Sequence, residues 1–158
     1  MIIISFTFIL LYILLSISIE DINTMLISEN KLSLLTLTGI VYLLYQGLSN
    51  EKIDVKELIL NNSFSMITIF IIMYSISYIS YKIFGINSLG MGDIKLSSIS
   101  TIWLGIELSF LSLFISFFLS AIYSLYGKLT KRLSPFQQYP FAPFLSIGIF
   151  SCWIIDKI

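Results

Sequence analysis

Residues 90–96 read Gly-Met-Gly-Asp-Ile-Lys-Leu, and they lie between long apolar segments. An ionisable side chain such as Asp93 is costly to hold at the edge of a hydrophobic segment, which makes it a candidate functional residue. The flanking Gly90 and Gly92 allow unusual backbone conformations and close approach of another chain. The stretch therefore predicts a site built around Asp93, and the rest of the chain must supply its partner.

The composition indicates an integral membrane protein. Of the 158 residues, 57% are hydrophobic and only 11% are charged, whereas a soluble domain carries about 25% charged residues. Nine basic and nine acidic residues cancel, so nothing favours nucleic acid as a partner. The chain has no histidine, which excludes Ser-His and Cys-His catalysis and HExxH metal sites. The single Cys152 is interpreted as a small buried hydrophobe, and we expect neither a metal nor a cofactor.

The uncharged stretches predict an all-α bundle of about six transmembrane helices, in a single membrane-embedded domain over residues 1–158. The stretch 96–127 is too long for one helix across a core of roughly 30 Å, so we divide it at Gly105–Glu107. Prolines favour a helix start, which places the beginning of the last helix near Phe141. The expected spans are roughly 2–19, 32–48, 60–81, 93–106, 108–127 and 141–156.

The basic residues favour an N-terminus on the outside. Cytoplasmic loops carry an excess of Lys and Arg, and this orientation puts six basic residues inside and three outside. The inside set is Lys31, Lys82, Lys95, Lys128, Lys131 and Arg132, and the outside set is Lys52, Lys56 and Lys157. Asp21, at the end of the first span, and Asp93, at the start of the fourth, then both lie at the cytoplasmic face.

Helix geometry puts Asp21 and Asp93 at similar depth. At about 1.5 Å per residue, Asp93 lies about 21 Å from Glu107, while Asp21 lies about 28 Å from Ile2. Two such aspartates can share a proton, one acting as general base on a water and the other polarising a carbonyl. The helix dipole favours a charge on Asp93, near a helix N-terminus, over one on Asp21, near a C-terminus. Which of the two acts as the base stays open.

The motif resembles that of the type IV prepilin peptidases, which are GxGD membrane aspartic proteases. That family pairs the motif aspartate with one after its first core helix, followed six residues later by Ile-Pro-Asn. Here Asp21 is followed by Ile27-Ser28-Glu29, so the isoleucine matches and the other two residues do not. The family also carries a Phe-Gly-Pro-Phe-like patch before its last helix, which Phe141-Ala142-Pro143-Phe144 resembles.

The resemblance implies a function with Asp21 and Asp93 as the catalytic residues and Gly90, Gly92 and Lys95 as supporting motif residues. Such enzymes serve type IV pilus and secretion systems. They cut the basic leader from prepilin-like or preflagellin-like proteins ahead of a hydrophobic helix, at the cytoplasmic face of the cell membrane. The partners would be that substrate and the lipid bilayer. Larger members also N-methylate the new terminus and have a cytoplasmic domain with paired cysteines. We expect this chain, which resembles the small form without that domain, to be a peptidase only.

Other interpretations stay open. Asp93 alone could be a helix N-cap, and Asp21 could be an interfacial charge. Glu20 and Glu29 are interpreted as loop charges or as groups that attract a basic leader. A Ser-Lys hydrolase would use Lys95 with Ser97. A small transporter or channel subunit would also carry intramembrane carboxylates, but we find no internal repeat of the kind many transporters show. Presenilin-type GxGD proteases carry a Pro-Ala-Leu motif, which this sequence lacks.

Overall fold

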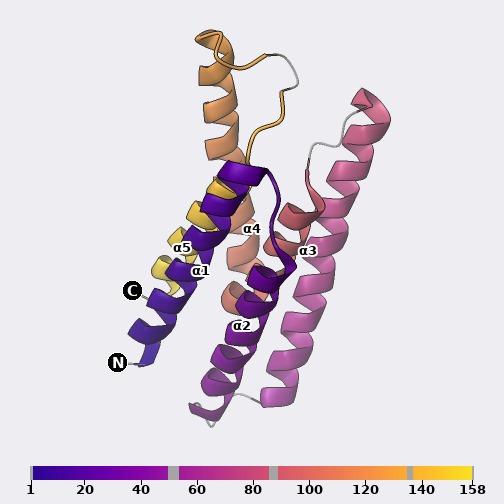
Figure 1. The fold of residues 1–158 in the computed structure, drawn as a ribbon. Coiled ribbons are helices and arrows are strands. Elements are labelled where there is room, and N and C mark those ends of the chain that lie inside the picture. The colour runs from indigo at the N-terminus through magenta and orange to yellow at the C-terminus, as the bar shows by residue number, and fades with distance from the viewer. Residues whose placement is uncertain (1, 50–53, 86–88, 135–136, 158) are drawn as a thin grey trace.

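The long apolar stretches form helices, because a helix satisfies its own backbone N–H and C=O groups within a bilayer. The computed structural model describes residues 2–49, 54–85, 89–134 and 137–157, so Lys52 lies outside the described residues. The described residues form five helices and no strand, which confirms the all-α expectation (Figure 1). The helices are α1 (Ile2–Thr24), α2 (Glu29–Ser49), α3 (Val55–Phe84), α4 (Met91–Leu129) and α5 (Ala142–Lys157).

Four of these helices, α1 to α4, are long and apolar enough to cross a membrane. Large apolar side chains such as Phe8, Phe64 and Phe114 are exposed on their outer surfaces, as lipid-facing positions require. The fifth helix, α5, has 16 residues, which is fewer than the roughly 20 that a span needs. It packs against α4 and α1. The chain is therefore a multi-pass helical membrane protein.

The described residues form five elements where we expected about six helices, and the stretch divided at Gly105–Glu107 accounts for the difference. The stretches 93–106 and 108–127 belong to one element, α4, which bends where Gly105 leaves helical geometry at φ 72° and ψ 179°. Extended ψ with positive φ is a region that essentially only glycine occupies. The kink falls within the Gly105–Glu107 stretch where we divided the sequence, and α4 therefore consists of two helical parts that meet at Gly105.

The two parts of α4 run in opposite directions, as Figure 1 shows. Asp93, before the bend, and Phe117, after it, line one cavity. Trp103, between them, lies 5.5 Å from Trp153 in the last turns of α5, whereas Phe117 lies 5.2 Å from Phe141 just before α5. The bend therefore returns the chain to the end of the bundle at which α4 began.

An aromatic cluster fixes the opposite end of the bundle. Tyr42 of α2 stacks on Trp103 of α4 with ring centroids 5.6 Å apart, and Trp153 of α5 packs edge-on against both rings. The indole N–H of Trp103 donates to the carbonyl of Leu35, and that of Trp153 donates to Thr7 Oγ1. Buried indoles need such partners, so this cluster ties four helices together with both indole N–H groups satisfied.

Small residues let α4 and α5 approach closely. Gly148 of α5 faces the carbonyl oxygen of Ser112 and the hydroxyl of Ser116, so closely that a Cβ at position 148 would overlap both atoms. Membrane helices commonly pack through such small residues, because lipid provides no hydrophobic drive for their association. This contact fixes the height of α5 against the returning part of α4.

Candidate active site

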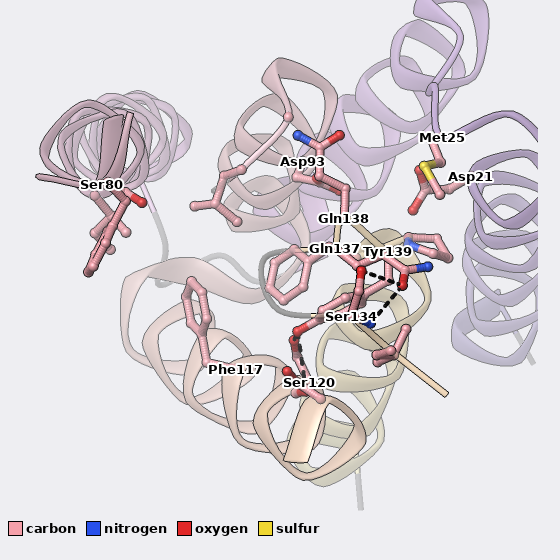
Figure 2. A pocket seen from close by; sticks show the side chains of 18 of the residues that line it. Asp21, Met25, Ser80, Asp93, Phe117, Ser120, Ser134, Gln137, Gln138 and Tyr139 are labelled. Carbon is pink, nitrogen blue, oxygen red and sulfur yellow. Dashed lines mark hydrogen bonds between the residues drawn. The ribbon is translucent and has the colours of Figure 1, made fainter. Parts of the chain in front are cut away.

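A cavity of about 670 Å³ lies at the end of the bundle where α1 ends and α4 and α5 begin. Its lining comes from α1, α3, both parts of α4 and the segment before α5 (Figure 2). Carboxyl, hydroxyl and amide groups share this lining with aromatic and aliphatic side chains. The volume lies in the range of ligand sites in proteins.

Asp93 lies on the first turn of α4, three residues after the N-cap residue Gly90. Its side chain interacts back with the backbone N–H of Gly90, as the third residue of a capping box does. The N-cap interpretation of Asp93 itself is therefore wrong. The residue is 9% exposed, and its Oδ1 has no hydrogen-bond partner among the described residues. Buried polar atoms are normally paired, so this oxygen is suited to meet a water or a substrate.

Asp21 lies in the last turn of α1 and is 5% exposed. The helix ends after it, where Met25 adopts φ 54° and its N–H donates to the carbonyl of Asp21. One carboxylate oxygen, Oδ2, accepts a hydrogen bond of 2.9 Å from the backbone N–H of Ala142. Asp21 thus ends one helix while its carboxylate faces the beginning of another, a relation that no local sequence signal indicates.

The fold brings Asp21 and Asp93 together. They are 72 residues apart in sequence, yet both line the cavity and their carboxyl groups interact electrostatically. Figure 2 shows Asp21 entering from α1, next to Met25, and Asp93 from the start of α4. Two carboxyl groups at one cavity can divide the roles of base and acid in hydrolysis.

The two motif glycines have different surroundings. Gly90 has φ −70° and ψ 150°, which any residue can adopt, and it lines the cavity beside the Asp93 carboxyl. Gly92 lies inside α4 and faces Ile27, such that an added Cβ would lie 3.0 Å from the Ile27 Cβ. Neither has positive φ, so the expectation of unusual backbone conformations is wrong. Close approach of another segment is what Gly92 requires, whereas an added Cβ at Gly90 would meet only the Asp93 carboxyl, at 3.3 Å.

The charged residues near the pair are engaged with one another. Glu20 Oε2 accepts hydrogen bonds from the N–H and the hydroxyl of Ser28 and pairs with Lys31 at 3.2 Å. Glu29 pairs with Lys95. Glu20 thus ties the connector after α1 to the start of α2, and Glu29 links α2 to the start of α4. Neither residue lines the cavity, so a role in substrate binding stays a prediction.

Ser97 lies apart from Lys95. Its hydroxyl is buried and donates to the carbonyl of Ile94, while Lys95 is paired with Glu29. This geometry does not support a Ser-Lys pair.

The segment before α5 contributes cavity residues that we did not single out from the sequence. Tyr139 bonds the hydroxyl of Ser120 of α4 at 2.8 Å, and Gln137 and Gln138 also line the cavity (Figure 2). Glutamines and a tyrosine in a polar connector resemble ordinary loop composition. From the sequence of this segment we used only the prolines, and they indicated the start of a helix and not a cavity.

The comparison with protein families matched one family, described as the type IV leader peptidase family, over residues 8–125. The match includes both Asp21 and Asp93 and ends before α5. The comparisons with curated proteins and with solved structures gave no match. Because the matched region covers most of the sequence, with two buried carboxyl groups at one cavity, the chain belongs to the type IV leader peptidase family.

Proposed function

We propose that this protein is a membrane aspartic endopeptidase that removes the leader from prepilin-like or preflagellin-like proteins. The observation that carries the proposal is the meeting of Asp21 and Asp93 at one cavity in a chain of the leader peptidase family. Family membership supports a peptidase in general, and the carboxyl pair supports the aspartic mechanism.

The chemistry needs one ionised and one protonated carboxyl group. The ionised group takes a proton from a water, the water oxygen attacks the scissile carbonyl carbon, and the protonated group gives its proton to the carbonyl oxygen. When the C–N bond of the tetrahedral intermediate breaks, the leaving nitrogen takes the proton that the base had accepted. One hydroxyl of the intermediate returns its proton to the other carboxyl group as the new carbonyl forms, which restores the starting pair. The Oδ1 of Asp93 has no hydrogen-bond partner within the described part of the chain, which supports direct contact with the reacting groups.

The substrate class follows from the family and from the position of the cavity. A cavity at one end of a lipid-facing bundle suits a peptide bond just outside a hydrophobic helix. Positive-inside counting puts this end at the cytoplasmic face of the cell membrane, where a basic leader would lie. Glu29, which is exposed and acidic, would attract such a leader. The alternative of a transporter subunit gains no support from the family match.

Co-expression with a candidate prepilin, followed by gel shift and N-terminal sequencing of the product, tests the proposal. Asp21→Asn and Asp93→Asn should each reduce cleavage to background while the protein stays in the membrane. Asp54→Asn is the matched control, because Asp54 caps α3 by accepting from the N–H of Lys56, and asparagine caps equally well. Full cleavage by either the Asp21 or the Asp93 variant would rule out the two-aspartate mechanism.

A further inference from the structure

The start of α5 has no capping side chain, and two of its backbone positions have no N–H group. Its first carbonyl acceptor is that of Phe141, which bonds the N–H groups of Phe144 and Leu145. Phe141 has no side-chain oxygen to cap the helix, as Ser, Thr, Asp or Asn would. Proline at positions 140 and 143 has no N–H. Among the first residues of α5, the N–H groups of Phe141 and Ala142 are therefore the ones left to be satisfied.

Asp21 interacts with both of these groups and accepts a hydrogen bond from the second. Its Oδ2 accepts from the Ala142 N–H at 2.9 Å, and the N–H of Phe141 also interacts with its carboxylate. Ala142 is fully buried, so water does not compete for its N–H. The carboxylate of α1 thus replaces the capping side chain that α5 lacks, and the positive end of the α5 dipole faces it.

Further polar contacts fix the register of α1 against α5. One turn from Asp21, the hydroxyl of Ser18 donates to the hydroxyl of Ser146 at 2.9 Å. Near the other end of both helices, the indole N–H of Trp153 donates to Thr7 Oγ1 at 2.9 Å. Since Gly148 also packs closely on α4, α5 is held between the helix that carries Asp21 and the helix that carries Asp93.

We infer that the start of α5, which lies outside the family match, is the positioning element for Asp21, and that the N–H of Ala142 is its essential group. By engaging Oδ2, this N–H fixes the rotation of the carboxyl group of Asp21, which lines the cavity. The inference rests on the proposed function for its catalytic consequence. It gives the Phe-Ala-Pro-Phe patch a physical role, which is to present two N–H groups between two prolines.

The test removes the N–H of Ala142 and little else. Incorporation of lactic acid at position 142 replaces the amide N–H by an ester oxygen and keeps the methyl group. Ala142→Pro is the genetic counterpart, because proline is tolerated in the first turn of a helix. Ala142→Gly keeps the N–H and serves as the conservative variant. Cleavage is measured per folded protein, with the unfolding midpoint as the measure of folding.

The ester variant should lose at least about tenfold in kcat, with KM within about twofold, because the misaligned carboxyl group affects the reaction rather than substrate binding. Ala142→Gly should keep most of the wild-type kcat. An ester variant with the kcat of Ala142→Gly would overturn the inference. If Ala142→Pro does not accumulate, the ester variant decides alone.

The two proposals can fail separately. A wild-type protein that cleaves no leader contradicts the proposed function. In that case, a double-mutant cycle between Asp21→Ala, which removes the acceptor, and the ester at position 142 still measures the contact through unfolding, and additive effects would overturn the positioning role. If the wild type cleaves and Asp21→Asn does not, an active ester variant overturns the positioning role alone.

Discussion

Gly92 of the GxGD motif faces Ile27, and a Cβ added at Gly92 would lie 3.0 Å from the Cβ of Ile27. The two residues belong to the two segments that resemble family motifs, one at the start of α4 and the other in the connector after Asp21. Each lies close in sequence to one of the two aspartates. The contact therefore sets the distance between the backbone segments that carry the two carboxyl groups.

Gly92→Ala should lower cleavage about tenfold through a small displacement of Asp93. Alanine forms helix better than glycine by about 1 kcal/mol, so helix propensity alone would make this variant more stable. A loss of activity at unchanged or higher stability would identify the contact with Ile27 as the cause. Cleavage rate and unfolding midpoint, measured on the same preparation, check this.

Ile27→Ala provides the matched second variant for this prediction. It removes the side-chain atoms beyond Cβ that lie 3.2 Å from the added methyl group. In the Gly92→Ala background it should restore part of the activity, so the two changes together should cost less than the product of their separate effects. Strictly multiplicative effects would show that the two positions act independently.

Much of the site could be predicted from the sequence, because its main signals are local. Charges that interrupt apolar runs located Asp21 and Asp93, and the lengths of these runs placed both at the same end of the bundle. The position of Gly105 within an overlong stretch located the bend in α4. The two helical parts that meet at this kink form the single element α4, so the described residues have five elements where about six helices were expected.

The rest of the site depends on contacts between distant segments, for which a single sequence has no signal. The dipole expectation for Asp21 considered only its own helix, whereas its carboxylate lies at the start of α5, 121 residues away. Glu20 and Glu29 looked equivalent as connector acids. Packing gives Glu20 three donors from Ser28 and Lys31, and gives Glu29 the single partner Lys95.

Glu20→Gln should lower the unfolding midpoint more than Glu29→Gln does. Glu20 holds the partly buried N–H and hydroxyl of Ser28 together with Lys31, and a neutral amide is a weaker acceptor for these groups. The Glu29 pair with Lys95 is exposed, and such pairs contribute at most about 1 kcal/mol. Thermal unfolding of both variants in one detergent checks the order.

The same two variants separate structural from substrate roles. If Glu29 attracts the basic leader, Glu29→Gln should raise KM at unchanged kcat, and added salt should reduce the difference. A KM equal to that of the wild type at low salt would remove Glu29 from the substrate-binding residues.

Gly148→Ala should destabilise the protein by about 1–3 kcal/mol. The new methyl group would overlap the Ser112 carbonyl oxygen, a backbone atom that cannot rotate away, so α4 and α5 must separate. Because the start of α5 also holds Asp21, cleavage should fall as well. Ile147→Ala, at an exposed neighbouring position, is the control and should change the unfolding midpoint much less. Equal midpoints for the two variants would show that the close α4–α5 contact is not required.

Gly105→Ala should destabilise the protein by roughly 1–3 kcal/mol through backbone strain alone. A Cβ at Gly105 meets no atom within 4 Å, so a steric clash cannot be the cause.

Gly85→Ala is the matched comparison, since Gly85 also has positive φ and open space, but its ψ of 10° places it in the left-handed helical region. L-residues enter that region at a cost of about 1–2 kcal/mol, whereas the region of Gly105 is essentially closed to them. We therefore expect Gly105→Ala to lower the unfolding midpoint more than Gly85→Ala. Only the Gly105 change should also impair cleavage, because it alters the angle between the part of α4 that carries Asp93 and the part that packs on α5. Equal losses of stability with full cleavage in both variants would show that the bend does not control the geometry of the site.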